Sequence, residues 1–198
     1  MLKRLFDLIL SAAGILLLSP FFVITAVLIK LDSKGPVFYR GVRVGKNGKP
    51  FRIYKFRTMV ADVDRIGGSS TPEDDPRITR IGGLLRKFKL DELPQLLNVL
   101  EGDMSFVGPR PEVSFYVNMF KEEEKVILNV KPGITDWASL WNSNEGAVLA
   151  GSSDPEKIYM EKIRPEKIKL QLKYIKEQSF SVDLKIIFLT LRKIVFRI

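Results

Sequence analysis

The longest hydrophobic stretch of the chain covers residues 8–29 and contains no charged side chain. As a helix it would reach roughly 33 Å, enough to cross the hydrocarbon core of a bilayer. Ser19-Pro20 interrupts the stretch near its middle, and the ring of Pro20 clashes with the carbonyl of Leu16. The hydroxyl of Ser19 can bond a carbonyl freed by that clash. The pattern therefore predicts a membrane-embedded helix with a break at Ser19-Pro20.

The charges on either side of this stretch choose between two shapes, a kinked span and a re-entrant hairpin. Lys3 and Arg4 precede it, and a larger basic excess follows it, at Lys30, Lys34, Arg40, Arg43 and Lys46. The excess places the downstream domain in the cytoplasm, so a straight span would export Lys3 and Arg4. We therefore favour the hairpin, with a single-span anchor as the alternative. The stretch is longer than the ~7–15 apolar residues of a signal peptide, so cleavage is not expected.

The remaining pattern predicts an α+β, helix-rich fold in which the membrane hairpin at 1–34 precedes a cytoplasmic catalytic domain at 35–198. Two strands, a small β-hairpin, are expected at 37–45 and 51–59, because Asn47-Gly48 between them is a strong hairpin turn signal. Loops are expected at 60–80 and 142–155. Helices, several of them amphipathic and interfacial, are expected at 84–89, 92–100, 112–130, 155–163, 165–178 and 182–198.

The last of these segments combines an apolar stripe with basic residues. The stripe is Leu184, Ile187, Leu191, Ile194, Val195 and Ile198, and the basic residues are Lys185, Arg192, Lys193 and Arg197. This pattern is typical of a basic amphipathic helix in a membrane interface. A helix that packs its stripe on the domain and solvates its basic face has the same pattern, so both interpretations stay open.

Composition narrows the chemistry that the chain can perform. It has no Cys and no His, which excludes thiolate nucleophiles, disulfides, Cys/His zinc sites and imidazole bases. A metal would be a hard, oxygen-preferring ion such as Mg²⁺. The net charge of +9 and the pI of about 9.7 indicate an anionic partner, which could be nucleic acid, anionic lipid or a phosphorylated substrate. Beside a membrane segment, anionic lipid accounts best for most of the basic residues.

Asp91 and Glu92 form the most informative polar pair, within Leu90-Asp-Glu-Leu-Pro-Gln95. Asp91 is expected to cap the helix that follows, because Pro94 is tolerated in a first helical turn. A helix N-terminus favours an ionised carboxylate, which suits a nucleophile or a metal ligand. Plain helix capping is the alternative.

Several cations could contact phosphate. Arg110 stands between two prolines, so its backbone is stiff and its guanidinium is preorganised for bidentate phosphate binding. Structural ion pairing explains it equally well. Lys55 and Arg57 lie on the second strand, Arg86 leads into the Asp91 turn, and Lys131-Pro-Gly-Ile-Thr135 forms another turn that could offer a hydroxyl. Aromatic residues beside Lys55 could also mark a nucleic-acid surface, but the membrane segment argues against it.

Taken together, these motifs resemble the bacterial monotopic phosphoglycosyl transferases over nearly the whole chain. The motifs that carry the resemblance are the basic start with Ser19-Pro20, Lys55-Phe-Arg-Thr-Met59, Asp75-Pro-Arg-Ile-Thr-Arg-Ile-Gly82, Leu90-Asp-Glu-Leu-Pro-Gln-Leu96, Gly102-Asp-Met-Ser-Phe-Val-Gly-Pro-Arg-Pro111, Lys131-Pro-Gly-Ile-Thr135 and Asp183-Leu-Lys-Ile-Ile187.

The resemblance implies transfer of a phosphosugar from a nucleoside diphosphate sugar, usually a UDP-sugar, to undecaprenyl phosphate at the cytoplasmic face of the bacterial inner membrane. Asp91 would form a covalent phosphosugar intermediate as UMP leaves, and Glu92 would help to hold Mg²⁺ or orient the acceptor. Lys55, Arg86 and Arg110 are the candidates for phosphate contacts. The product would begin a surface glycan such as exopolysaccharide, capsule or the O-antigen of lipopolysaccharide. The partners would be a nucleotide sugar, the lipid and the bilayer, but no nucleic acid, and a homodimer is allowed for.

One segment departs from the family pattern. After Thr135 the family commonly continues Gly-Trp-Ala-Gln-Val-Asn-Gly-Arg, whereas this chain has Asp136-Trp-Ala-Ser-Leu-Trp-Asn-Ser-Asn-Glu145. The family's Gly, Gln and Arg are missing, so we do not assume a nucleotide contact there, and Arg164 is a candidate replacement.

Two other classes of protein remain as alternatives. A non-catalytic membrane adaptor would bind anionic lipid through the basic surface, and a membrane-tethered nucleic-acid binder would use the Lys55 strand.

Overall fold

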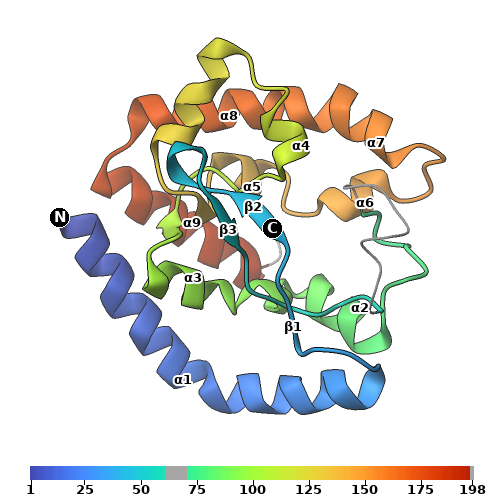
Figure 1. The fold of residues 1–198 in the computed structure, drawn as a ribbon. Helices are drawn as coiled ribbons and strands as arrows, with labels where there is room; N and C mark the ends of the chain where they lie inside the picture. Colours follow the sequence, from blue (N-terminus) through green and yellow to red (C-terminus); the bar gives the residue numbers. More distant parts are fainter. Residues whose placement is uncertain (61–70, 197–198) are drawn as a thin grey trace.

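The computed structural model describes residues 1–60 and 71–196, and for Val195 the backbone alone. Figure 1 shows a helix-rich domain with short strands near its centre and the long helix α1 (Leu2–Asp32) along its edge. The helix-rich expectation is therefore confirmed. Residues 61–70 of the predicted loop at 60–80, and Arg197 and Ile198 of the C-terminal helix, lie outside the described residues.

Helix α1 is continuous through Pro20, and Figure 1 shows it bent near its middle rather than divided into two helices. The hydroxyl of Ser19 donates to the carbonyl of Leu16 at 2.8 Å, as expected for a carbonyl that the proline ring displaces. The helix is long and apolar enough to cross a membrane by length and composition, and only 11% of its most apolar window is buried. Its sides are therefore mostly uncovered by the domain.

The N-terminal end of α1 is fixed to the domain by charged side chains. Lys3 Nζ lies 2.5 Å from a carboxylate oxygen of the buried Asp183, on α9 (Phe180–Phe196). Arg4 donates to two carbonyls near the end of α3 (Gln95–Glu101), at 2.6 and 2.9 Å. The buried carboxylate of Asp7 accepts from the amide of Phe106 at 3.1 Å.

The C-terminal end of α1 is fixed to the same domain. The guanidinium of Arg57 donates to the carbonyls of Ser33 and Ile29 at 2.7 and 3.3 Å. Asp32 accepts from the amide of Ile81 at 3.0 Å. Arg57, which the sequence predicted to contact substrate, thus binds backbone carbonyls at and just after the C-terminal end of α1.

The predicted β-hairpin is confirmed, but it is divided into two short antiparallel pairs. These are β1 (Phe38–Tyr39) with β4 (Lys55–Phe56), and β2 (Val42–Val44) with β3 (Pro50–Arg52). The turn η1 (Lys46–Gly48) has Asn47 and Gly48 at φ 58° and 73°, the left-handed values that favour these residue types. The hairpin places Lys55 at the centre of the domain beside η3 (Leu90–Glu92).

Two of the predicted helices have other boundaries in the structure. Helix α2 spans Arg80–Lys87 and begins before residue 84, since the hydroxyl of Thr79 accepts from the amide of Gly82 at 3.0 Å. The single helix expected at 112–130 is instead α4 (Ser114–Val117) and the 3₁₀ helix η4 (Glu122–Asn129). Lys121 is extended between them, and its amide bonds the Glu124 carboxylate at 3.0 Å.

Most of the remaining helices lie on the side of the domain away from α1 in Figure 1. The loop expected at 142–155 contains α6 (Glu145–Leu149), which forms because Leu149 is wholly buried. The helices expected at 155–163 and 165–178 form one continuous rod. Its segments are α7 (Pro155–Ile158), the π-helix η5 (Tyr159–Ile163) and α8 (Arg164–Glu177).

Helix α9 packs on the domain through Asp183 and Ile186, which are buried, and through the stripe residue Ile187, which is half-buried against the same core. Three other stripe residues, Leu184, Leu191 and Ile194, are 42%, 57% and 54% exposed. Much of the stripe is therefore uncovered by the domain.

Two adjacent strands support the Pro-Arg-Pro loop. β5 (Ser105–Val107) pairs in parallel with β6 (Gly133–Thr135). The backbone of Gly108, directly after β5, touches that of Gly133, the first residue of β6, and a Cβ on Gly133 would lie 2.1 Å from the Gly108 nitrogen. Only glycine permits this approach, which holds the Arg110 loop against the start of β6.

Two neighbouring glycines of α2 provide a test of how closely this helix packs against the backbone of Thr58. A Cβ on Gly82 would lie 2.0 Å from the Thr58 carbonyl oxygen, so we expect Gly82→Ala to push α2 away and cost about 1–3 kcal/mol of folding free energy. On Gly83 the nearest side-chain atom is 3.9 Å away, so Gly83→Ala should be neutral or stabilising through helix propensity. Denaturant unfolding of the purified proteins measures both changes. Equal effects of the two substitutions would contradict this packing.

Candidate active site

The turn between α2 and α3 carries the two carboxylates that the sequence singled out. Lys89 has φ 56°, a left-handed conformation that reverses the chain before η3. Helix α3 begins only at Gln95, with Pro94 at its cap, where the missing amide hydrogen of proline costs little. Asp91 therefore lies within the 3₁₀ turn, and the predicted role of Asp91 as the helix cap is wrong.

The Asp91 carboxylate is buried beside several cations. Its residue is 7% exposed, and among the residues that the structure describes its carboxylate makes no hydrogen bond or ion pair. Burial raises the pKa of Asp91, against the opposing charge of Lys55, and the neighbouring Glu92 adds to the rise. The expectation of a carboxylate stabilised by a helix terminus is therefore wrong. Poor solvation makes this carboxylate more basic, and so a better nucleophile.

Glu92 is bound on both sides by cations. Lys55 Nζ lies 2.7 Å from its Oε1, and Arg110 binds it bidentately, with Nη1 2.9 Å from Oε2. Burial alone would raise the pKa of Glu92, but Arg110 and Lys55 hold it well below its usual range. Both carboxylate oxygens are thus engaged, and of the predicted metal pair Asp91 alone has oxygens free for Mg²⁺.

Two further cations surround Asp91. Arg86 is mostly buried and donates from Nε to the hydroxyl of Thr58 at 2.9 Å. The charges of Arg86 and Lys89 both act to lower the pKa of Asp91. Together with Lys55 and Arg110, they make a cationic cluster around the two carboxylates. Such a cluster can bind a diphosphate once the substrate displaces Glu92 from the two side chains that hold it.

Three of the five predicted substrate-binding residues meet at this cluster, namely Lys55, Arg86 and Arg110. Arg57 caps α1, as described above. Thr135 shares a hydrogen bond of 2.8 Å with Thr190 and so joins β6 to α9. Arg164, the suggested replacement for the missing family arginine, pairs with Glu124 at 3.3 Å and is occupied there.

Two residues that the sequence interpretation did not select belong to the site. The charge of Lys89 acts to lower the pKa of Asp91, and its position two residues before Asp91 was the signal available in the sequence. Asp136 is wholly buried and accepts from the amide of Arg110 at 3.3 Å. No local pattern connects Asp136 with Arg110, because the contact depends on the pairing of β5 with β6.

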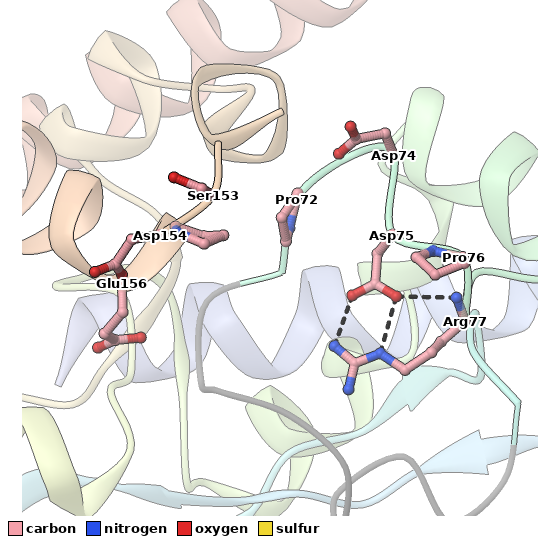
Figure 2. A pocket seen from close by; sticks show the side chains of 9 residues that line it. Pro72, Asp74, Asp75, Pro76, Arg77, Ser153, Asp154 and Glu156 are labelled. Atoms are coloured by element: carbon pink, nitrogen blue, oxygen red, sulfur yellow. Dashed lines mark hydrogen bonds and ion pairs between the residues drawn. The ribbon is translucent and has the colours of Figure 1, made fainter. Parts of the chain in front are cut away.

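A separate cavity of about 450 Å³ opens between residues 72–77 and 153–156 (Figure 2). Arg77 binds Asp75 there as a fork, at 2.8 and 2.6 Å. Three further carboxylates line the cavity, those of Asp74, Asp154 and Glu156. None of the predicted site residues lines it, and its acidic lining disfavours a diphosphate. The cationic cluster is therefore the better phosphate site.

Comparison with known proteins establishes the family. The family model described as "Bacterial sugar transferase" matches residues 1–197. The chain belongs to the bacterial sugar transferase family. This agrees with the family that the sequence motifs indicated.

Individual relatives match almost the whole chain. It is 42% identical over 193 residues to the uncharacterized sugar transferase EpsL of Bacillus subtilis, which covers 98% of this chain and 87% of that protein. It is 40% identical to the UDP-N-acetylgalactosamine-undecaprenyl-phosphate N-acetylgalactosaminephosphotransferase of Aeromonas hydrophila and to the UDP-glucose:undecaprenyl-phosphate glucose-1-phosphate transferase of Escherichia coli, over 98% of this chain. The chain spans only 43% and 40% of those two longer proteins.

The charge environment of Asp91 predicts a pH effect. Lys89→Asn suits the left-handed backbone but removes a charge that lowers the pKa of Asp91. The pKa of Asp91 should rise, so the loss of its ionised form on acidification should begin at higher pH. The acid limb of the rate profile for donor turnover measures this shift. Lys87→Asn, the same charge change on the exposed end of α2, should leave the limb in place, and equal shifts would contradict the assignment.

Proposed function

We propose that the protein transfers a sugar phosphate from a nucleoside diphosphate sugar, with UDP as the nucleotide, to undecaprenyl phosphate through a covalent intermediate on Asp91. The observation that carries the proposal is a buried Asp91 carboxylate, without a bonding partner among the residues that the structure describes, beside a cationic cluster in a chain of the bacterial sugar transferase family. The names of the A. hydrophila and E. coli relatives, which specify transfer to undecaprenyl phosphate, support the acceptor.

The proposed reaction has two displacements at one phosphorus. A carboxylate oxygen of Asp91 attacks the phosphorus that bears the sugar, and the bond to the bridging oxygen breaks, so that UMP leaves with the electron pair. An oxygen of undecaprenyl phosphate then attacks the same phosphorus and releases the Asp91 carboxylate. Both attacking groups are already anions, so no general base is needed, which agrees with a chain that lacks histidine.

Lys55, Arg86 and Arg110 are the proposed phosphate contacts. Glu92 holds Lys55 and Arg110 in place before the donor arrives, so little reorganisation is required when the diphosphate replaces it. Because the donor competes with Glu92 for the two cations, the same carboxylate can accept them again when UMP leaves.

Magnesium remains a proposal for this site. The free oxygens of Asp91 fit Mg²⁺, which proteins often bind through one or two carboxylates together with substrate phosphates and water. When bound, the ion would neutralise charge on the diphosphate. Glu92 could join it only after releasing Lys55 or Arg110.

We also propose that α1 is re-entrant and that the domain lies on the cytoplasmic face of the inner membrane. Lys3 and Arg4 contact the domain at one end of the helix, and Arg57 binds its other end. A membrane cannot separate groups in contact, so a straight span would require the N-terminal contacts to break. Bending at Pro20 lets both ends stay on one side while the apolar middle enters lipid.

The uncovered stripe of α9 suits the same membrane surface. Leu184, Leu191 and Ile194 are exposed beside the exposed basic residues Lys185 and Arg192. Apolar side chains with flanking cations favour the headgroup region of anionic lipid. We propose that α9 lies there and, with α1, holds Asp91 near the depth of the acceptor phosphate.

The nucleophile is tested by Asp91→Asn. Turnover, measured as UMP release with a panel of UDP-sugars, undecaprenyl phosphate and Mg²⁺, should fall by more than about 10³-fold because no intermediate can form. With donor alone, the unmodified protein should gain the mass of a phosphosugar on residue 91, and the variant should not. Asp103→Asn, on the loop before β5, is the matched control and should keep both signals.

Other outcomes of that experiment select the alternatives. Normal turnover by Asp91→Asn would remove Asp91 as the nucleophile. Salt-sensitive binding to anionic vesicles without UMP release from any donor would favour the membrane adaptor. Salt-dependent oligonucleotide binding would favour the nucleic-acid binder.

The topology is tested with single cysteines, since the chain has none of its own. A membrane-impermeant maleimide should not label Leu2→Cys in intact cells but should label it after permeabilisation. Ser153→Cys, exposed on the domain, should behave identically. Labelling of Leu2→Cys from outside would establish a single span instead.

A further inference from the structure

Asp136 is a buried carboxylate whose two oxygens serve different parts of the molecule. Oδ1 accepts from the amide and the hydroxyl of Ser139, both at 2.7 Å, and so caps α5 (Trp137–Trp141). Oδ2 accepts from the backbone amide of Arg110 at 3.3 Å. The side chain is 0% exposed. It therefore connects the start of α5 directly to the loop that carries Arg110.

Capping alone does not require this side chain. A cap uses one oxygen, and a serine or threonine hydroxyl supplies it without placing a charge in the interior. Burying an ionised carboxylate is costly unless hydrogen bonds and nearby cations stabilise it. The second oxygen is thus surplus to the capping of α5, and it bonds the amide of Arg110. Glu92 is the main cause that raises the pKa of Arg110, and the charge of Asp136 adds a smaller part.

The position of Asp136 makes this contact specific to the Arg110 loop. It follows β6 directly, and the amide of Gly133 donates to the carbonyl of Pro109 at 3.0 Å. Backbone pairing thus holds the loop on one side of Arg110, and Asp136 fixes the amide of Arg110 itself. At the other end of Arg110, the guanidinium donates two hydrogen bonds to the Glu92 carboxylate.

We propose that Asp136 is a positioning residue, which fixes Arg110 so that its guanidinium meets the donor diphosphate. The proposal rests on the proposed function, in which Arg110 contacts phosphate. It also gives a role to the segment that departs from the family pattern: where glycine is common, this chain has a carboxylate that holds the phosphate-binding arginine from behind. Asp136 does not touch the substrate, so its effect on donor binding must pass through Arg110.

The test uses Asp136→Ser, which keeps a capping oxygen for α5 but is too short to reach Arg110. Binding of UDP in the presence of Mg²⁺ is measured by calorimetry on the protein with Asp91 in place, because Asp91 is the proposed Mg²⁺ ligand and UDP has no sugar to transfer. We expect Asp136→Ser to weaken UDP binding about tenfold, equivalent to the loss of one charge-assisted hydrogen bond. Ser139→Ala, which removes a bond to Asp136 but leaves Arg110 untouched, should bind UDP normally.

A double-mutant cycle separates positioning from plain stability. In an Arg110→Ala background, Asp136→Ser should weaken UDP binding no further, because the residue through which it acts is absent. A tenfold loss that persists in that background, or no loss in either, would overturn the proposal. Thermal unfolding of each variant, compared with Ser139→Ala, reports any effect on α5.

Failure of the wider proposal gives a different result. If the protein with Asp91, Asp136 and Arg110 intact does not bind UDP at all, the UDP-sugar function fails. If that protein binds UDP and Asp136→Ser binds it equally well, only the positioning role fails.

Discussion

The double ion pair of Glu92 organises the site. One carboxylate binds Lys55 from the β-hairpin and Arg110 from the loop after β5, and so joins three segments that are distant in sequence. Without it, two mostly buried cations would face each other at close range. Buried ion pairs add little net stability, since desolvation offsets their attraction. Their value here is geometric, because the pairing holds the cations ready for another anionic ligand.

The second constraint is that both ends of α1 rest on one domain. Asp183 holds the N-terminal end through Lys3, and Arg57 holds the C-terminal end through backbone carbonyls. These contacts leave the apolar middle of the helix uncovered while fixing its ends relative to the cationic cluster. In the proposed reaction, a soluble nucleotide sugar and a lipid phosphate must meet at a shared depth. Rigid attachment of α1 to the domain that carries Asp91 would set that depth.

The sequence predicted correctly those features that depend on residues close to one another in the chain. Asn47-Gly48 identified the hairpin, and the Asp91-Glu92 and Pro-Arg-Pro motifs identified the centre of the site. Errors arose where a distant partner decides the outcome. Arg57 has the composition of a phosphate ligand but caps a helix more than twenty residues before it, and Asp136 reaches Arg110 only because two strands pair. The sequence likewise predicted an easily ionised Asp91, because burial of a turn is not visible in its residues.

Asp91 and Glu92 are adjacent in sequence, yet the fold gives them opposite environments. Glu92 takes the ion pairs, and its pKa falls well below the usual range, while burial raises that of Asp91, which has no bonding partner among the described residues. Neighbouring titratable groups whose pKa values are pushed apart usually divide the chemical roles between them. A carboxylate that already holds two cations is a poor nucleophile, since its electron pairs are engaged. In the proposed reaction Asp91 is therefore the nucleophile, and the cations bound to Glu92 stabilise the phosphate that it attacks.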